Sequence, residues 1–249
     1  MAEYLSGRNA VREVLLAGRR RIEGVLLAEG VDEQGIVAEI VTLCREGGIA
    51  MRRAPRAELE RLSDDLTHQG VLAQVSPYPY VDLDAILRAA QAAPEPAFLL
   101  VLDSLQDPQN VGALLRTADA VGVHGVIIPT RRAAQITPAV SRASAGAAEH
   151  LSVARVTNIA RTIETLQKEG IWVAGLEGRP DAQDYRQANL DLPLALVLGS
   201  EGQGLRRLVA ERCDFLLRIP MCGRVSSLNV SVAGALALYR AWHAREPLP

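Results

Sequence analysis

The sequence has almost no lysine and few cysteines. Lys168 is the only lysine among 27 basic residues, so arginine carries nearly all of the positive charge. The three cysteines, Cys44, Cys213 and Cys222, form neither a C-x-x-C pair nor an even set. This spacing argues against a disulfide framework and against a zinc site, and it favours a protein of the reducing cytoplasm.

The sequence also lacks any apolar run that approaches the ~20 residues needed to cross a bilayer. Its first eight residues do not show the basic stretch followed by an apolar stretch that marks a secretory signal. The histidines, His68, His124, His150 and His243, have no spacing that suits metal ligands. We therefore expect a cytoplasmic protein without a membrane partner and without a metal.

The length of 249 residues suits one large domain or two smaller ones, with enough material for a buried core. The net charge of −2 does not exclude a nucleic-acid partner, because binding needs only a local basic face. Arginines cluster at residues 19–21, 52–56 and 131–132. Each cluster alone is more often a solvated surface, but together they are a hint of phosphate contacts.

Short elements of both kinds alternate up to about residue 76, which indicates a small α/β domain. Prolines follow, and we interpret residues 77–96 as a linker that contains one helix at residues 83–92. The elements expected before this linker are helices at residues 7–16, 35–45 and 57–62 and strands at residues 24–28 and 71–75.

The rest of the chain, residues 97–249, alternates apolar runs with helical patterns. Runs that are apolar throughout are typical of parallel strands covered on both faces, so the alternation predicts an α/β domain with an open, mostly parallel sheet. The expected strands are residues 98–102, 125–128, 171–174, 194–198 and 215–219, and the expected helices are residues 111–121, 159–168, 205–212 and 230–242.

Ligands of such sheets bind at the loops that leave the carboxyl ends of the strands. The loop after the first of these strands leads to Asn110, which stands where a helix is expected to begin and is suited to cap it. Arg116 lies six residues further on. From the spacing alone, a capped helix with a surface arginine explains these two residues as well as a functional site does.

Two further loops carry polar residues at the same edge. The loop Gly-Ser-Glu-Gly-Gln-Gly that begins at Gly199 lets the backbone approach a ligand, and Glu201 within it is not a core residue. This loop lacks the patterns of dinucleotide and nucleoside-triphosphate sites. Before the last helix, Ser226, Ser227 and Asn229 offer hydroxyls, an amide and free N–H groups. Ordinary helix capping and a site for a carboxylate or phosphate both explain them.

Taken together, these three loops resemble the three motifs of the SpoU/TrmH-type ribose 2′-O-methyltransferases of the SPOUT superfamily. No member of the motif set is missing, so an inactive homologue is not expected. The resemblance implies an enzyme that uses S-adenosyl-L-methionine to methylate a ribose 2′-hydroxyl of RNA. The implied catalytic residues are Asn110, Arg116, Glu201, Ser227 and Asn229, and the implied cofactor-binding residues are Gly199, Ile219 and Leu228.

The resemblance extends over nearly the whole chain. Residues 144–153 are similar to a stretch of the subgroup that methylates a guanosine in the peptidyl-transferase region of large-subunit (23S) ribosomal RNA. Residues 1–76 resemble the L30e-like RNA-binding domain of that subgroup, and residues 97–249 resemble its methyltransferase domain. The resemblance therefore implies a deep trefoil knot around residues 197–233, a homodimer, and 23S ribosomal RNA or an assembling large subunit as the partner.

Two other functions remain open at this point, a transfer-RNA ribose 2′-O-methyltransferase and a non-catalytic RNA-binding protein of ribosome assembly. The complete set of polar motif residues favours an enzyme. The role of Arg116 has two interpretations as well. It is either a general base assisted by the substrate phosphate, or a clamp that holds a phosphate and stabilises negative charge on the 2′-oxygen.

Overall fold

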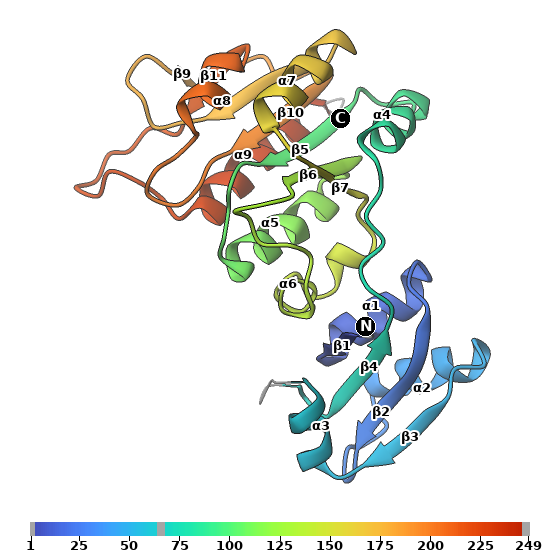
Figure 1. Ribbon diagram of the computed structural model, residues 1–249. Coiled ribbons are helices and arrows are strands. Elements are labelled where there is room, and N and C mark those ends of the chain that lie inside the picture. Colours follow the sequence, from blue (N-terminus) through green and yellow to red (C-terminus); the bar gives the residue numbers. More distant parts are fainter. Residues whose placement is uncertain (1–2, 64–67, 246–249) are drawn as a thin grey trace. The chain divides into compact units, whose positions relative to one another are not determined.

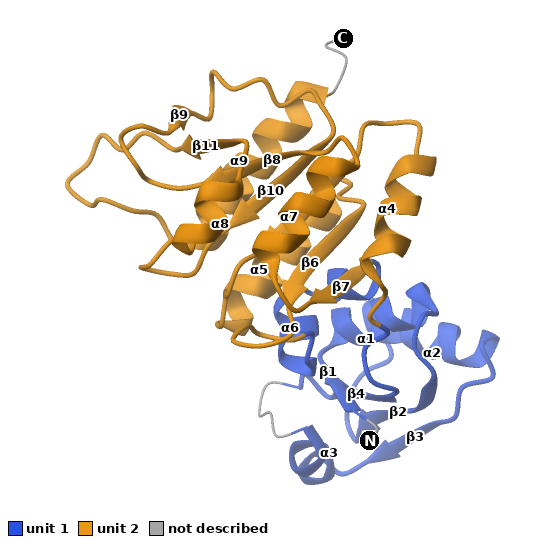
Figure 2. Ribbon diagram, turned by 45° about the horizontal axis from the view of Figure 1, so that its top comes forward, with its two compact units in different colours: residues 1–79, 136–150 blue, residues 80–135, 151–249 orange. Residues whose placement is uncertain are grey.

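The computed structural model describes residues 3–63 and 68–245. Contacts between residues divide the chain into two compact units (Figure 2). Unit 1 comprises residues 1–79 and 136–150, and unit 2 comprises residues 80–135 and 151–249. The segment 136–150 therefore belongs to unit 1, although in the sequence it lies between two strands of unit 2.

Unit 1 is built on a mixed four-stranded sheet with the strand order β1-β4-β2-β3 (Figure 1). Strand β4 (Val71–Val75) pairs antiparallel with β1 (Glu3–Ser6) and with β2 (Ile22–Ala28), and β2 pairs parallel with β3 (Met51–Ala54). The helices of unit 1 are α1 (Arg8–Ala17), α2 (Ile36–Glu46), α3 (Arg56–Ser63), α6 (Pro138–Ala143) and the short 3₁₀ helix η1 (Ala147–Glu149).

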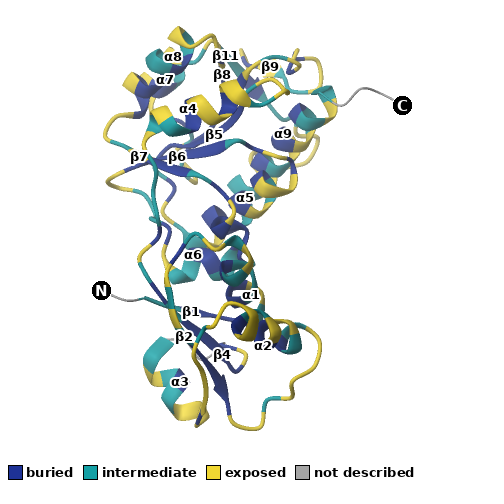
Figure 3. Cartoon of the chain, turned by 90° about the vertical axis from the view of Figure 1, so that its right-hand side faces the viewer, coloured by how far each residue is buried: buried dark blue, intermediate teal, exposed yellow. Residues whose placement is uncertain are grey.

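Both faces of the unit 1 sheet are covered, and strand β4 shows how. Val71 and Ala73 belong to a cluster with side chains of α1 and α2, whereas Leu72 belongs to a cluster with Leu59 of α3. Successive side chains of a strand point to opposite faces, so a strand covered on both sides is apolar throughout. In Figure 3, β4 and the second half of β2 accordingly have the buried colour.

Unit 2 is built on a seven-stranded sheet with the order β7-β6-β5-β10-β8-β11-β9. Every pairing in it is parallel, which confirms the sheet predicted from the apolar runs. The strands are β5 (Phe98–Leu102), β6 (Gly125–Pro129), β7 (Val153–Val156), β8 (Trp172–Leu176), β9 (Gln183–Asp184), β10 (Leu194–Leu198) and β11 (Phe215–Arg218). The helices are α4 (Leu83–Ala92), α5 (Pro108–Ala120), α7 (Ile159–Lys168), α8 (Arg207–Arg212) and α9 (Val230–Arg245).

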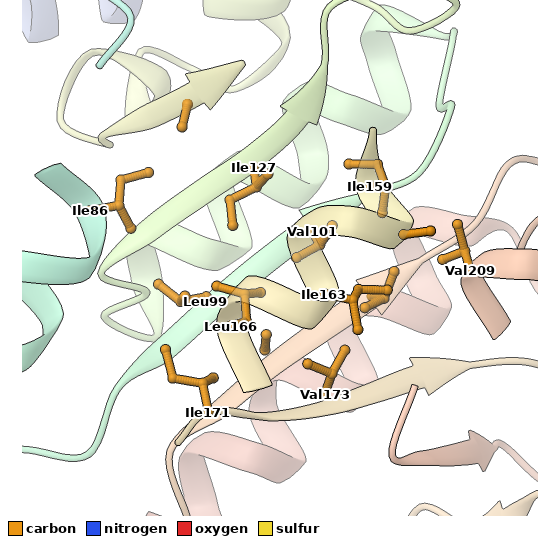
Figure 4. Close-up of a cluster of buried hydrophobic side chains, with 14 of the residues drawn as sticks. Ile86, Leu99, Val101, Ile127, Ile159, Ile163, Leu166, Ile171, Val173 and Val209 are labelled. Carbon is orange, nitrogen blue, oxygen red and sulfur yellow. The ribbon is translucent and has the colours of Figure 1, made fainter. Parts of the chain in front are cut away.

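Helices pack on both faces of this sheet. On one face, Ile163 and Leu166 of α7 pack with Leu99 and Val101 of β5 in a cluster that also includes side chains of α4 and α8 (Figure 4). Each fully buried aliphatic side chain of this kind contributes about 1.5–3 kcal/mol. On the other face, α5 and α9 are in contact with each other, and α9 also contacts the central strand β10. The site described below lies where α5 and α9 begin.

The structure contains strands that the sequence pattern did not predict, namely β1, β3, β7 and β9. Strand β3 reads Met-Arg-Arg-Ala and is exposed over its first three residues, so it lacks both the apolar run and the alternation that mark a strand. Strand β8 extends to Leu176, two residues beyond the predicted end, and α8 begins at Arg207 rather than at residue 205. Within residues 3–63 and 68–245, no helix is both long enough and apolar enough to cross a bilayer.

Candidate functional site

A cavity of about 680 Å³ lies at the carboxyl edge of the unit 2 sheet, and we call it the sheet-edge cavity. The last residues of β8 and β10 line it, together with Ile219, which follows β11. The loops after these strands and the first turns of α5 and α9 complete its wall. This edge is where open parallel sheets bind their ligands.

All of the site residues predicted from the sequence line this cavity except Arg116. The lining residues among them are Asn110, Gly199, Glu201, Ile219, Ser227, Leu228 and Asn229. Arg116 is exposed on α5, and within the described ranges it makes neither a hydrogen bond nor an ion pair. The fold therefore brings the second and third motifs together with Asn110, but it leaves Arg116 outside the cavity of its own chain.

A chain of hydrogen bonds joins the three motifs. The Nδ2 amide of Asn110 donates to Glu201 and, at 3.0 Å, to the Oδ2 oxygen of Asp107. The Oδ1 oxygen of Asn110 accepts from Nδ2 of Asn229 at 3.0 Å. Both amide hydrogens of Asn110 thus have carboxylate acceptors, and such bonds are stronger than those between neutral groups. The three loops consequently hold one another in register across the cavity.

Asn110 is not the cap of α5, contrary to the prediction from its position. The cap is Asp107, whose Oδ1 oxygen accepts from the backbone N–H of Gln109 at 3.0 Å, and Pro108 occupies the first helical position. An acidic cap followed by proline is a favoured helix start, because proline has no N–H to satisfy there. Asn110 is the third residue of the helix, so its side chain is free to join the hydrogen-bond chain.

Asn229 does cap a helix, and it takes part in the site as well. Its Oδ1 oxygen accepts from the backbone N–H of Ser231 at 2.8 Å and from the Ser231 hydroxyl at 2.6 Å, while its carbonyl accepts from the N–H of Ala233 at 2.9 Å. Its Nδ2 amide meanwhile donates to Asn110. Helix capping, one of the two explanations that the sequence left open for this residue, is thus observed, and its amide belongs to the hydrogen-bond chain as well.

Gly199 is required by the chain's own backbone. A Cβ atom at this position would lie 2.1 Å from the carbonyl carbon of Gly204 and 2.3 Å from the nitrogen of Leu205, which no side chain can tolerate. Ser200 and Gly204 exchange two backbone hydrogen bonds of 3.0 and 2.9 Å, and Gly202 and Gly204 have φ angles of +74° and +67°. The glycines thus let the second-motif loop fold tightly back on itself.

Glu177 lines the cavity and was missed by the sequence analysis. Its Oε2 oxygen accepts from the backbone N–H of Leu205 at 2.8 Å, and a Cβ atom at Gly204 would lie 2.6 Å from the same oxygen. Glu177 is the first residue after β8. The strand predicted from the sequence ends at residue 174, which places Glu177 within the following loop rather than directly after the strand. A strand extended to Leu176 would have pointed to Glu177.

The pair Asp103–Arg206 is a second contact that the sequence did not reveal. Asp103 is the first residue after β5 and is fully buried. The Arg206 guanidinium donates to its Oδ1 oxygen from Nε at 2.9 Å and from Nη2 at 2.6 Å. A forked pair of this kind is both strong and directional. It ties the loop of the first motif to the end of the loop of the second.

The charge that lines the sheet-edge cavity is negative. Glu177 and Glu201 contribute carboxylates, and no arginine, lysine or histidine among the described residues lines it. The polar remainder of the wall consists of hydroxyls, amides and loop backbone. Such a wall suits a ligand that carries positive charge and many hydrogen-bond donors.

A cavity of about 520 Å³ in unit 1 has the opposite character, and we call it the arginine cavity. It is lined by Arg8 and Arg56, the first residues of α1 and α3, and by no acidic side chain among the described residues. Arg8 donates from its backbone N–H to Oε1 of Gln69 at 3.1 Å and from Nε to the Gln69 carbonyl at 3.3 Å. The other residues of its lining are Asn9, Val31, Ile36 and Gly70.

The arginine clusters at residues 19–21 and 52–56 are largely neutralised. Arg20 is buried, donates from Nε to the Ser76 carbonyl at 2.8 Å, and forms ion pairs with Glu3 and with Glu149. Burial raises the pKa of the Glu149 carboxyl, an effect that the charge of Arg20 opposes. Acidic side chains also pair with Arg21 (Glu23), Arg52 (Glu58), Arg53 (Glu33) and Arg56 (Glu60). These two clusters are thus not the free basic surfaces that the sequence hinted at. Arg131 and Arg132, in contrast, are exposed and form no ion pair within the described ranges.

A third hollow, of about 400 Å³, lies between α5 and α9 on the surface of unit 2, and we call it the α5–α9 groove. Most of its wall is apolar, and Val232, Leu236 and Tyr239 are 49%, 40% and 44% exposed. The other lining residues are Ala113, Thr117, Ser231 and Ala235. Arg116 lies between Ala113 and Thr117 in α5.

Comparison with protein families assigns both parts of the chain. Residues 97–239 match the SpoU rRNA Methylase family. Residues 4–81 match the family described as RNA 2′-O ribose methyltransferase substrate binding. The first match spans more than half of the chain, and it contains all three motifs.

Individual proteins of the same kind are similar over nearly their whole length. The chain is 45% identical over 246 residues to the Bacillus subtilis protein named "Putative TrmH family tRNA/rRNA methyltransferase YacO", covering 99% of this chain and 97% of YacO. It is 30% identical, with a TM-score of 0.72, to the structure of a TrmH-family RNA methyltransferase from Porphyromonas gingivalis, covering 96% of this chain and 88% of the other.

The fold is also that of AviRb, a SpoU methyltransferase from Streptomyces viridochromogenes that was solved in complex with AdoMet. The TM-score is 0.79 at 24% identity, over 97% of this chain and 90% of AviRb. These matches agree with the family that the three motifs predicted. The chain belongs to the SpoU/TrmH family of RNA 2′-O-methyltransferases and carries the family's N-terminal substrate-binding domain.

Proposed function

We propose that this protein transfers a methyl group from S-adenosyl-L-methionine to a ribose 2′-hydroxyl of RNA, and that the target is a guanosine of 23S ribosomal RNA. The observation that carries this proposal is the hydrogen-bond chain Glu201–Asn110–Asn229, which gathers the three motifs on one cavity. A set of polar side chains held in this way is suited to orienting two reactants.

The sheet-edge cavity fits this cofactor. Its volume of about 680 Å³ lies in the range of small-molecule sites, and its carboxylates suit a ligand with a sulfonium and an ammonium group. Gly199, Ile219 and Leu228 would hold the cofactor, since all three line the cavity. When bound, S-adenosyl-L-methionine supplies a methyl group on a positively charged sulfur.

The polar chain would position the nucleotide. Glu201 and Asn229 fix the amide of Asn110, and Ser227 adds an exposed hydroxyl on the same wall. Each of these groups can accept or donate a hydrogen bond to a ribose or a phosphate. Their task in this proposal is alignment, and alignment alone can supply several kcal/mol of catalysis.

In this proposal the protein is a homodimer, and Arg116 of one protomer serves the sheet-edge cavity of the other. The α5–α9 groove is the exposed apolar surface on unit 2 that a second copy would cover. Ser231 and Val232 line the groove, whereas Asn229 and Val230 at the same helix start line the sheet-edge cavity. In a symmetric dimer across the groove, Arg116 of one protomer would therefore lie near the cavity of the other. There it would clamp a phosphate and stabilise charge on the 2′-oxygen.

Unit 1 would hold the RNA. Residues 4–81 match a substrate-binding family, and the arginine cavity offers two arginines. Arg8 forms no ion pair within the described ranges, whereas Arg56 pairs with Glu60. Arginine is well suited to phosphate, because its planar group donates two parallel hydrogen bonds. Val31 and Ile36 add an apolar wall against which a base could pack.

The choice of ribosomal RNA over transfer RNA rests on residues 144–153, which resemble the 23S guanosine subgroup. The name of YacO keeps transfer RNA as the second candidate. Mapping 2′-O-methylation in RNA from a deletion strain would decide between them. We expect one guanosine of 23S ribosomal RNA to lose its methyl group and transfer RNA to stay unchanged. A loss confined to transfer RNA would overturn the ribosomal assignment.

A further inference from the structure

We propose that Glu177 is a cofactor-binding residue whose second carboxylate oxygen accepts a hydrogen bond from a donor group of S-adenosyl-L-methionine, either a ribose hydroxyl or the α-ammonium group. This inference rests on the cofactor proposed above. It adds an acidic side chain to a set of cofactor contacts that otherwise consists of Gly199, Ile219 and Leu228.

The carboxylate of Glu177 is held in place at the wall of the sheet-edge cavity. The backbone N–H of Glu177 donates to the Leu217 carbonyl at 2.8 Å, which continues the pairing of β8 with β11. On the other side, Oε2 accepts from the N–H of Leu205 at 2.8 Å. The side chain thus bridges the end of β8 and the end of the second-motif loop, and its position is fixed before any ligand binds.

The second oxygen, Oε1, is free to accept. No hydrogen bond or ion pair to it occurs among residues 3–63 and 68–245, although Glu177 is half-buried. Gly204 provides the room, because a Cβ atom there would lie 2.8 Å from Oε1. Glu201, the other acid of the cavity, differs in this respect, since its carboxylate already accepts from Asn110.

Support of the loop alone does not account for a carboxylate at this position. A neutral amide oxygen could accept the Leu205 N–H equally well, without the cost of removing a charge from water. Instead, a half-buried negative charge lies on a cavity that Glu201 also lines and that contains no basic side chain in its described wall. The donor groups of a positively charged ligand would offset the free-energy cost of removing this carboxylate from water.

Two donors of the cofactor have the required chemistry. The ribose offers a pair of hydroxyls, and the amino-acid part offers an ammonium group. A hydrogen bond to a charged acceptor is stronger than one between neutral groups. A nucleoside that has the ribose but lacks the ammonium group distinguishes the two donors.

The test is calorimetric titration of the full-length protein with S-adenosyl-L-methionine, S-adenosylhomocysteine and 5′-methylthioadenosine. In Glu177→Gln, the amide oxygen can still accept from Leu205, but the NH₂ group then faces the cofactor's donor. We expect the affinity for S-adenosyl-L-methionine and S-adenosylhomocysteine to fall at least about tenfold. An equal fall for methylthioadenosine identifies the ribose, and an unchanged affinity for it identifies the ammonium group.

The matched control is Glu211→Gln, which removes an exposed carboxylate of α8 outside the cavity. It should bind all three ligands as the unchanged protein does. The melting temperature of the unliganded protein is the second measurement. We expect Glu177→Gln to leave it unchanged, because the bond to Leu205 is retained.

Two results would overturn the assignment. Affinities within about twofold of the unchanged protein for all three ligands would show that Glu177 makes no contact with the cofactor. An equal loss for all three together with a lower melting temperature would show that Glu177 only supports the loop. Failure of the proposed cofactor itself looks different, because the unchanged protein would then bind none of the three.

Discussion

The sheet-edge cavity and the arginine cavity differ in the sign of the charge that lines them. The first contains Glu177 and Glu201 and no basic side chain in its described wall, whereas the second contains Arg8 and Arg56 and no acidic one. The net charge of −2 averages over this difference. The comparison teaches that local charge indicates the ligand of each unit: a cationic cofactor for unit 2 and anionic RNA for unit 1.

The largest effect is expected at Arg116, which lines neither cavity of its own chain. Arg116→Lys keeps the positive charge but loses the planar, two-pronged donor. We expect turnover to fall at least about a hundredfold, comparable to the loss of one oxyanion donor. Cofactor affinity should change by less than about tenfold. Single-turnover methylation and calorimetric titration measure the two quantities.

Two outcomes for Arg116→Lys would contradict this account. Near-normal turnover would show that only the charge matters. Collapse of cofactor binding with an intact fold would mean that Arg116 belongs to the cofactor site.

For Gly199→Ala we expect a large loss of cofactor binding in the sheet-edge cavity and no effect on the arginine cavity. The added Cβ would overlap the backbone of Gly204 and Leu205, so the second-motif loop must open. We expect overpacking of about 2 kcal/mol and a loss of cofactor affinity of ~30-fold, with RNA affinity unchanged. Gly223→Ala is the control, because Gly223 does not line the sheet-edge cavity and a Cβ atom there meets nothing within 4 Å. Equal behaviour of the two variants in cofactor titrations would refute this view of the loop.

For Arg8→Ala we expect an intermediate loss of RNA binding at the arginine cavity and no effect on the sheet-edge cavity. Losing one phosphate contact should weaken RNA binding about tenfold and lower the slope of log affinity against log salt by about one. Cofactor affinity should be unaffected. Arg45→Ala, at an exposed position in the last turn of α2, is the control. If Arg8→Ala and Arg45→Ala weaken RNA binding equally, the arginine cavity is not a specific contact site.

The smallest effect concerns two cysteines of unit 2. Burial raises the pKa of the Cys213 thiol to about 12, so it should resist alkylation near neutral pH, where too little thiolate is present. Cys222 is exposed and follows Met221, which lines the sheet-edge cavity. A cationic thiol reagent should modify Cys222 about threefold faster than an anionic one of equal size. Mass spectrometry would follow both sites, and a faster anionic reagent would contradict a negative cavity.

Much of unit 2 was predictable from the sequence, because its central strands are buried on both faces. Apolar runs such as residues 98–102 and 194–198 have no other simple explanation, and polar loops after them mark the carboxyl edge. The same reasoning placed Asn110, Glu201 and Asn229 on one site. It missed Glu177 because the predicted strand ended two residues early.

Other features depend on contacts between distant residues, which local patterns do not contain. Residues 51–54 form the strand β3 only because they pair with β2. Their own sequence is mostly polar, and three of the four residues are exposed. The segment 136–150 belongs to unit 1 because α6 contacts β1 and η1 contacts α1. In addition, Glu149 pairs with Arg20, 129 residues earlier in the chain. The L30e-like character of residues 1–76 and the trefoil knot around residues 197–233 stay predictions of the family resemblance.

The most direct test of the account is methyl transfer by the purified protein from labelled S-adenosyl-L-methionine to 23S ribosomal RNA, with transfer RNA in a parallel reaction. The account predicts label on one guanosine ribose of the 23S RNA, none on transfer RNA, and none on either RNA with Asn110→Ala, which removes the centre of the hydrogen-bond chain. Tight RNA binding without label on any RNA would contradict an enzymatic function, and label that persists in Asn110→Ala would contradict the assigned site.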